Sequence, residues 1–285
     1  MMYQKIIQHP DQEKNEMNLG LSSYTYTWAV GVPGSLPVKP LSAKSLIDKA
    51  FSSGLKLVQI ADNLPLEKFS NEEQKELSSY AATKYVSIEM GGRGLTPEHT
   101  IKCLEVAKTL HSPILRMVID GTEFEPDLES VIGIIRDLLP EFKSKKIKLA
   151  IENHDRFKAR EFEKIIQSVG SEWIGICLDS VNSMGAGEGF ETVSKILLPY
   201  TINLHIKDFS IRRLSHKMGI VIEGRPAGQG MLNIKELINQ LHVTNSCQSA
   251  ILELWTPPES QIEDTLKKEE QWANESIHYL KELFK

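Results

Sequence analysis

Four residues that can bind a metal ion stand at the ends of short apolar runs in the second half of the chain. Glu152 ends Lys-Leu-Ala-Ile-Glu, Asp179 ends Gly-Ile-Cys-Leu-Asp, His205 ends Asn-Leu-His, and Glu253 ends Ile-Leu-Glu. One such residue would be explained by a loop cap or a surface ion pair. Three carboxylates packed together, however, repel one another and take up protons unless a cation neutralises them. Because oxygen ligands and one imidazole suit fairly hard divalent ions, this set predicts one Mn2+, Mg2+, Co2+ or Zn2+ ion.

The alternation of side chains predicts that these four residues face one common interior. Successive side chains of a strand point to opposite faces. In the run that ends at Glu152, Ile151 lies on the apolar face, so Glu152 takes the other face. Asp179, His205 and Glu253 alternate with apolar neighbours in the same way. We therefore expect all four side chains to point inward.

Eight short apolar runs alternate with segments of helical periodicity. In one of these segments, Phe162, Ile165, Ile166 and Val169 have the spacing of a buried helix face. Such alternation implies parallel strands, and at this length it predicts an α/β fold with a single (β/α)8 TIM barrel over residues 18–285. An open, doubly wound sheet lacks support, because no Gly-x-Gly-x-x-Gly follows the first run. The predicted strands are residues 19–24, 55–60, 85–90, 114–119, 147–152, 174–179, 202–206 and 250–254.

Two local signals add detail to this prediction. Thr96 followed by Pro97 and Glu98 is typical of a helix start, and residues 259–285 carry the apolar spacing of a long terminal helix. Residues 1–17 are polar with little periodicity, so we expect a flexible N-terminal extension.

Composition excludes several classes of protein. The 285 residues are 41% hydrophobic and 25% charged, which is typical of a globular protein. The formal net charge of −5 offers no basic surface for nucleic acid or an anionic membrane. Three widely spaced cysteines, Cys103, Cys177 and Cys247, argue against a disulfide framework and a Cys-rich zinc module. The start lacks the apolar core of a signal peptide, and no apolar run reaches the ~20 residues of a membrane span. We expect a soluble, cytoplasmic protein, for which a homo-oligomeric state stays open.

Five short motifs follow one another in the second half of the chain. They are Ile-Glu-Asn-His at 151–154, Cys-Leu-Asp-Ser-Val-Asn at 177–182, His-Ile-Lys-Asp at 205–208, Gly-Gln-Gly-Met-Leu-Asn at 228–233 and Leu-Glu at 252–253. In these motifs the chain resembles the xylose isomerase-like TIM-barrel superfamily, in particular its sugar (phosphate) isomerase and epimerase branch. The first half matches only in architecture.

The resemblance implies a role for each matching residue. Glu152, Asp179, His205 and Glu253 would bind the metal, and the two glutamates would also act as an acid/base pair. The implied activity is that of a metal-dependent isomerase or epimerase of a sugar or sugar phosphate, which moves a proton through an enediolate.

The resemblance also implies a substrate cleft. His154 and Lys207 would line it, and Arg212 would reach the far end of the sugar. Asn182 stands where some sugar 3-epimerases place a histidine, and an asparagine can still bind a hydroxyl but cannot titrate.

Other functions of the same superfamily are alternatives. A dehydratase of a polyol, inosose or sugar acid would use the same base and metal but expel a β-hydroxyl, for which His154 could supply the proton. A DNA-repair endonuclease would need more histidines at strand ends than His154 and His205, and the negative net charge also argues against DNA. A non-enzymatic sugar-binding module would be expected to lack one of the two glutamates.

Three basic or glycine-rich features have two interpretations each. Arg116 lies inside an apolar run and either binds a substrate oxygen or pairs with Glu89. Residues 91–94, Gly-Gly-Arg-Gly, form either a phosphate cradle or, more simply, a flexible loop. Lys207, Arg212 and Arg225 either form an anion-binding cluster or, as we favour slightly, are an ion-paired lysine and two solvated arginines.

Overall fold

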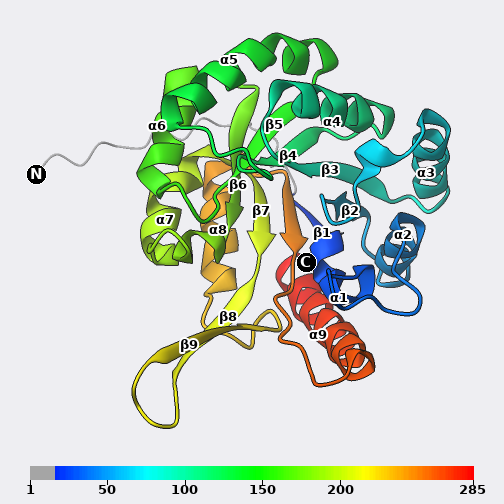
Figure 1. The fold of residues 1–285 in the computed structure, drawn as a ribbon, viewed down its shortest axis with the longest axis vertical. Coiled ribbons are helices and arrows are strands. Elements are labelled where there is room, and N and C mark those ends of the chain that lie inside the picture. Colours follow the sequence, from blue (N-terminus) through cyan, green and yellow to red (C-terminus); the bar gives the residue numbers. More distant parts are fainter. Residues whose placement is uncertain (1–16) are drawn as a thin grey trace, which may run out of the picture.

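Eight parallel strands close into a barrel in the computed structural model, which describes residues 17–285 (Figure 1). Strands β1 to β7 follow one another around the barrel, and β10 lies between β7 and β1. The predicted (β/α)8 TIM barrel is therefore confirmed. The barrel strands are β1 (Asn18–Ser22), β2 (Leu57–Ile60), β3 (Ser87–Arg93), β4 (Ile114–Val118), β5 (Lys148–Glu152), β6 (Ile174–Asp179), β7 (Thr201–Ile206) and β10 (Ser249–Leu252).

Helices surround the barrel and cover the apolar outer faces of its strands (Figure 1). The predicted start of one helix is confirmed, because the side chain of Thr96 caps α4 and Pro97 is its first residue. No helix of residues 17–285 is long and apolar enough to cross a membrane. The helices are α1 (Thr27–Val30), α2 (Ala43–Ser52), α3 (Asn71–Thr83), α4 (Pro97–Thr109), α5 (Leu128–Lys145), α6 (Ala159–Val169), α7 (Phe190–Leu197), α8 (Ile234–Thr244) and α9 (Ile262–Leu283), with short 3-10 turns at Ser23–Tyr26, Leu66–Lys68, Asn182–Met184 and Leu198–Tyr200.

The interior of the barrel changes from apolar to polar toward the carboxyl ends of the strands. A small apolar cluster of Ile114, Ala150, Cys177 and Ile202 fills one level of the interior. Two residues further along β4, β5 and β6, the inward positions are charged: Arg116, Glu152 and Asp179. Alternation within the strands therefore lifts the charged side chains above an apolar floor.

A two-stranded hairpin that the sequence patterns did not reveal follows β7. Its antiparallel strands, β8 (Asp208–Arg213) and β9 (Ile220–Arg225), extend beyond the barrel (Figure 1). The carboxylate of Asp208 accepts hydrogen bonds from the backbone N–H groups of Phe209, Gly228, Gly230 and Leu232. A Cβ atom on Gly230 would lie 2.0 Å from an oxygen of Asp208, so only glycine fits there.

The structure corrects the expected loop at residues 91–94. Strand β3 continues to Arg93, so Gly91 and Gly92 belong to the sheet. A Cβ atom on Gly91 would lie 3.2 Å from the Cα atom of Ala61 and 3.5 Å from Cδ of Arg116. The glycine therefore serves close packing inside the barrel and not a phosphate cradle.

The predicted N-terminal extension lies almost wholly outside the described residues. Residues 1–16 are not described, and Met17, which the prediction included, is buried in the core. The predicted terminal helix is α9, which spans Ile262–Leu283.

Helix α9 anchors the segment that follows β1 through one buried carboxylate. Glu269 is 1% exposed and accepts hydrogen bonds from the backbone N–H groups of Trp28 (2.8 Å) and Ala29 (2.9 Å). Burial raises the pKa of Glu269 to about 7, although the two N–H groups oppose this shift. The folded protein thus holds a proton here at pH values where the unfolded chain has lost it.

This raised pKa predicts a pH dependence of stability. The contribution of Glu269 is fully present below its ordinary pKa of 4.5 and is lost as the pH rises through about 7. The free energy of unfolding of the wild type should therefore decrease between pH 4.5 and about 7. In Glu269→Gln this decrease should be smaller, by at most ~3 kcal/mol. Urea unfolding at a series of pH values measures this slope. Glu275→Gln, on the exposed face of α9, is the control, and equal slopes in the wild type and Glu269→Gln would contradict the assignment.

Candidate metal centre

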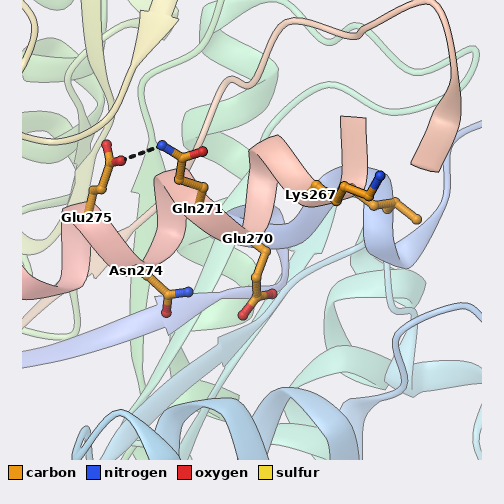
Figure 2. A pocket seen from close by; sticks show the side chains of 6 residues that line it. Lys267, Glu270, Gln271, Asn274 and Glu275 are labelled. Atoms are coloured by element: carbon orange, nitrogen blue, oxygen red, sulfur yellow. Dashed lines mark hydrogen bonds between the residues drawn. The ribbon is translucent and has the colours of Figure 1, made fainter. Parts of the chain in front are cut away.

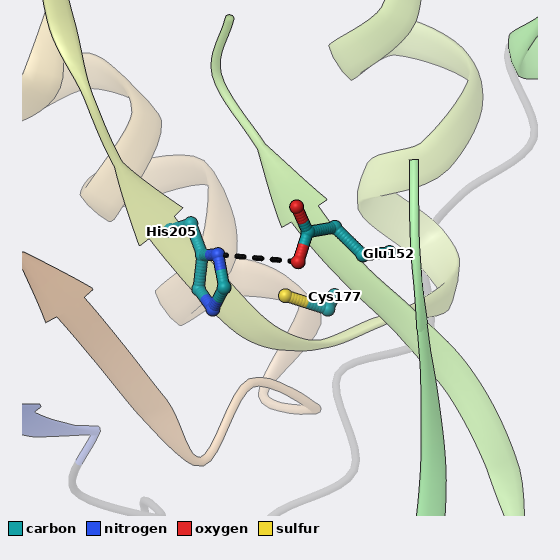
Figure 3. A group of neighbouring side chains, drawn as sticks. All are labelled: Glu152, Cys177 and His205. Atoms are coloured by element: carbon teal, nitrogen blue, oxygen red, sulfur yellow. Dashed lines mark ion pairs between the residues drawn. The ribbon is translucent and has the colours of Figure 1, made fainter. Parts of the chain in front are cut away.

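The four residues at the strand ends meet around the imidazole of His205. Its Nδ1 atom lies 3.4 Å from Oε1 of Glu253, 3.5 Å from Oε2 of Glu152 and 3.8 Å from Oδ2 of Asp179. All four side chains are at most 1% exposed. Figure 3 shows Glu152 and His205 pointing toward each other from neighbouring parts of the barrel, with the ion pair between them dashed. The structure thus brings the four side chains together inside the barrel, as the alternation along the strands predicted.

One atom of this cluster is buried without a hydrogen-bond partner in the described part of the chain: Nδ1 of His205. Oδ2 of Asp179 and Oε2 of Glu253 form no regular hydrogen bond either, but each lies 2.9 Å from the ammonium group of Lys207. The ligand atoms that His205, Asp179 and Glu253 offer lie within 4.8 Å of one another. A buried polar atom is rarely left unpaired, since this costs about 1–3 kcal/mol. A divalent cation would give Nδ1 a partner and could replace the ammonium group at the two oxygens, so the donor set fits a metal.

A thiol lies beside the same imidazole. Cys177, Glu152 and His205 form a second group whose ligand atoms lie within 4.8 Å (Figure 3). Burial raises the pKa of the Cys177 thiol well above its ordinary value, and Glu152 adds to the shift. Among the predicted ions, Mg2+ and Mn2+ prefer carboxylate oxygens to a thiol. The carboxylates and the imidazole are therefore the better donor set.

A buried amide orients the imidazole. Oε1 of Gln59 lies 2.6 Å from Nε2 of His205, and Nε2 of Gln59 donates to Glu89 (3.0 Å) and Asn203 (3.2 Å). These two contacts fix which end of the amide faces His205, so Nε2 of the ring must carry its proton and donate it to Gln59. Nδ1 then faces the three carboxylates. Burial lowers the pKa of His205, but Glu253 and Glu152 raise it overall, which favours a proton on Nδ1 that a metal ion would replace. Sequence reasoning missed Gln59, although a polar residue within the apolar run 57–60 was a usable signal.

Lys207 supplies positive charge to two of the carboxylates. Its Nζ atom lies 2.9 Å from Oδ2 of Asp179 and 2.9 Å from Oε2 of Glu253. Burial disfavours both carboxylate ions, but Lys207 and His205 hold the pKa of Asp179 well below its usual range and also lower that of Glu253. The same carboxylates raise the pKa of Lys207 against the effect of its own burial. Both acids are therefore ionised and available to a cation at neutral pH.

Arg116 and Asn182 hold the third acid, Glu152. Nε of Arg116 donates to Oε2 of Glu152, and Nδ2 of Asn182 donates to Oε1 at 2.7 Å. Nη1 of Arg116 also donates to Asp62 at 3.2 Å. The alternative that Arg116 pairs with Glu89 is wrong. Both side chains point into the barrel, but Arg116 extends toward the carboxyl ends of the strands, where it pairs with Glu152 and Asp62. Each oxygen of Glu152 thus has a donor.

A cleft of about 440 Å³ opens above these residues. Two of the predicted substrate residues, Asn182 and Lys207, line it. Two others do not: His154 contacts Arg93, and Arg212 is exposed on the hairpin and pairs with Glu223. The full lining is Tyr24, Thr27, Asp155, Val181, Asn182, Met184, Gly185, Lys207, Leu254 and Trp255.

The structure does not form the anion-binding cluster of Lys207, Arg212 and Arg225. Arg225, like Arg212, pairs with Glu223, whereas Lys207 pairs with Asp179 and Glu253. The alternative interpretation, an ion-paired lysine with arginines turned away from the site, agrees with these contacts.

A second depression lies on the outer side of α9 (Figure 2). Its exposed lining includes Lys267, Glu270 and Gln271, and Gln271 donates to Glu275 on the same helix. These solvated side chains converge on no common point, so the cleft at the strand ends is the candidate site.

Known proteins resemble this chain over nearly its whole length. Residues 47–283 match the family described as the xylose isomerase-like TIM barrel. A curated relative, the 3-oxo-isoapionate decarboxylase of Pectobacterium atrosepticum, is 28% identical over 264 residues, which are 93% of this chain and 95% of the relative.

Two solved structures share the fold. D-psicose 3-epimerase from Clostridium cellulolyticum H10, solved with D-tagatose, matches with a TM-score of 0.70 and 14% identity over 93% of this chain and 97% of its own. A xylose isomerase-like TIM barrel protein from Mycobacterium smegmatis, solved in complex with magnesium, matches with a TM-score of 0.65 and 13% identity over 95% of this chain and 100% of its own. At these identities, the two structures show the fold alone.

Removing the imidazole should remove the metal. Protein purified without chelator is expected to carry about one divalent ion per chain, and His205→Ala should lose it because Nδ1 is a central donor. Cys177→Ala, which changes the neighbouring thiol, should keep it. Elemental analysis of the three proteins tests this, and full metal content in His205→Ala would show that the ligands are assigned wrongly.

Changing Gln59 should weaken metal binding without removing a ligand. In Gln59→Leu the imidazole loses the acceptor that keeps its proton on Nε2, and we expect the affinity for Mn2+ to fall about 10- to 100-fold. Titration calorimetry measures this affinity. Gln240→Leu, on the exposed side of α8, is the control. An unchanged affinity in Gln59→Leu would mean that Gln59 does not orient His205.

Proposed function

The chain belongs to the xylose isomerase-like TIM-barrel family, and we propose that it is a divalent-metal-dependent enzyme that forms the enediolate of a small polyhydroxylated substrate. The first candidate reaction is the isomerisation or epimerisation of a sugar or sugar phosphate. Its support is one observation: the carboxylates of Glu152 and Glu253 lie at 3.5 and 3.4 Å from the same atom, Nδ1 of His205.

Two acids placed in this way can serve one reacting carbon. A divalent ion held by Glu152, Asp179, His205 and Glu253 would polarise the substrate carbonyl and stabilise the negative charge that develops on its oxygen. One glutamate then removes the proton from the neighbouring carbon, and the other returns it. Return to the opposite face is epimerisation, and return to the adjacent carbon is isomerisation.

The cleft residues can hold the substrate hydroxyls. The raised pKa of Lys207 keeps its ammonium group charged, so it can donate a hydrogen bond to a substrate oxygen near Glu253. Asn182 lines the cleft and can bind a hydroxyl through its amide. The rim carries Tyr24 and Trp255, whose rings can cover the sugar.

Decarboxylation of a 3-oxo acid is the second candidate. Its specific support is the 28% identity to a decarboxylase over 93% of this chain. Breaking the bond between the carboxylate and the carbon next to a ketone releases CO2 and leaves the electron pair as an enolate, which is an enediolate when that carbon bears a hydroxyl. The enolate then takes up one proton. This route needs a proton donor but no base. It agrees with Glu152, whose two oxygens already accept hydrogen bonds from Arg116 and Asn182.

Dehydration has less support from the geometry. It requires a proton donor at the leaving hydroxyl, for which His154 was the candidate. Nε2 of His154 faces Nη2 of Arg93 at 3.2 Å and Nδ1 faces Asp155 at 3.1 Å, so both ring nitrogens have protein partners. A binding module without activity is also disfavoured, since both glutamates lie in the site.

Turnover in D2O separates the two candidate reactions. With Mn2+ present, ketoses, ketose phosphates and 3-oxo sugar acids are each incubated with the enzyme and followed by NMR and by CO2 release. An isomerase or epimerase should place deuterium in recovered sugar, whereas a decarboxylase should release one CO2 per product and place one deuterium in it.

The variants sharpen this test. Glu253→Gln should lower the rate about 10²- to 10⁴-fold, as expected for loss of an acid/base group. Gln271→Ala, in the depression on α9, is the matched control and should keep the wild-type rate. Unchanged turnover in Glu253→Gln would contradict the proposed function.

A further inference from the structure

A chain of ion pairs faces the metal ligands from the other side of the barrel mouth. Arg116, which holds Glu152, donates from Nη1 to Asp62 at 3.2 Å, and Nε of Arg93 donates to the other oxygen of Asp62 at 3.2 Å. These residues come from the ends of β2, β3 and β4, whereas the candidate ligands come from the ends of β5, β6, β7 and β10. The chain of ion pairs therefore connects Glu152 to Arg93.

The side chain of Arg93 belongs to the inner face of β3. Glu89 faces the interior, where it contacts Gln59 and Asn203, so the alternate positions Gly91 and Arg93 share that face. Gly91 leaves space for the side chain of Arg116, as its packing shows. Arg93, at the last position of the strand, therefore lies at the level of the cleft.

Contacts of its partners place Arg93 beside the cleft. Tyr24, which lines the cleft, donates from its hydroxyl to Asp62 at 3.1 Å. Nη2 of Arg93 lies 3.2 Å from Nε2 of His154, whose other ring nitrogen faces the cleft residue Asp155. Because arginine can only donate, Nε2 of His154 is the acceptor of this contact.

Arg93 has donors to spare, unlike its buried neighbour. The side chain of Arg93 is 36% exposed, and that of Arg116 is 2% exposed. A guanidinium carries five N–H donors, of which Arg93 uses one on Asp62 and one on His154. No acceptor among residues 17–285 lies against the remaining ones. These remaining N–H groups lie on the two Nη atoms, and together they can donate two parallel hydrogen bonds to a planar anion.

We propose that Arg93 binds a carboxylate of the substrate, so that the substrate is a polyhydroxylated carboxylic acid and not a neutral sugar. This inference rests on the proposed function and narrows it, because a carboxylic acid substrate favours the decarboxylation of a 3-oxo acid over the isomerisation of a neutral sugar. A carboxylate matches the single free guanidinium edge, whereas a phosphate dianion would call for further cations. Lys207 is engaged by Asp179 and Glu253, and the hairpin arginines are engaged by Glu223.

Three compounds with the same diol test the assignment. In 3,4-dihydroxybutanoate, a vicinal diol is available to the metal and a carboxylate stands one carbon away. Butane-1,2,4-triol is its neutral counterpart, and 3,4-dihydroxybutyl phosphate carries a phosphate instead. Binding of each is measured by calorimetry with the Mn2+-loaded protein and, in parallel, with EDTA.

The expected result is a selective loss. Arg93→Gln should weaken binding of 3,4-dihydroxybutanoate about 10- to 100-fold, the range for a charge-assisted hydrogen bond, and leave binding of the triol unchanged. Arg93→Lys keeps the positive charge beside Asp62 and should recover part of the affinity. This recovery would show that the loss in Arg93→Gln does not come from misfolding. Arg160→Gln, an exposed arginine on α6, should behave as the wild type.

Other outcomes overturn the proposal. The proposal is wrong if the wild type and Arg93→Gln bind 3,4-dihydroxybutanoate with equal affinity. It is also wrong if the wild type does not bind this compound. Preferential binding of the phosphate that depends on Arg93 would replace the carboxylate by a phosphate. If the carboxylate binds through Arg93 equally well in EDTA, the assignment of Arg93 stands and the metal-dependent function fails.

Discussion

The burial of three carboxylates around one imidazole is the constraint on which the rest of this site depends. Glu152, Asp179 and Glu253 are almost fully buried, where an uncompensated charge costs several kcal/mol. Arg116 and Lys207 supply two positive charges to them. Nδ1 of His205 nevertheless has no hydrogen-bond partner among residues 17–285. A divalent ion completes this arrangement, and its chemistry would polarise a substrate carbonyl at that point.

The barrel meets this constraint through its layers. An apolar floor keeps water from the interior, and above it Gln59, Glu89 and Asn203 form a hydrogen-bonded layer that turns the imidazole of His205 toward the carboxylates. Burial raises the pKa of Glu89, which favours the protonated form of this carboxyl. The ligands are thus oriented by rigid strands and not by mobile loops.

The barrel and the inward direction of the Glu152 side chain were predictable, because both follow from the local periodicity of apolar residues. The partners of Arg116 and the role of Gln59 were not predictable, since they depend on which side chains meet across a closed barrel. The hairpin β8–β9 was missed because β8 ends in charged residues and the apolar run that begins β9, Ile220–Ile222, is only three residues long. Arg212 illustrates the same limit, because its place on that hairpin, paired with Glu223, separates it from the cleft.

The most direct test is a crystal structure of the protein grown with Mn2+, with diffraction recorded at the manganese absorption edge. The account predicts one anomalous peak about 2.0–2.3 Å from Nδ1 of His205 and from oxygens of Asp179 and Glu253, with Glu152 at or beside the ion. The Nζ atom of Lys207 should then have moved from the position that it occupies between Asp179 and Glu253. A structure with Lys207 still bridging both acids, and no peak among the four residues, would contradict the account.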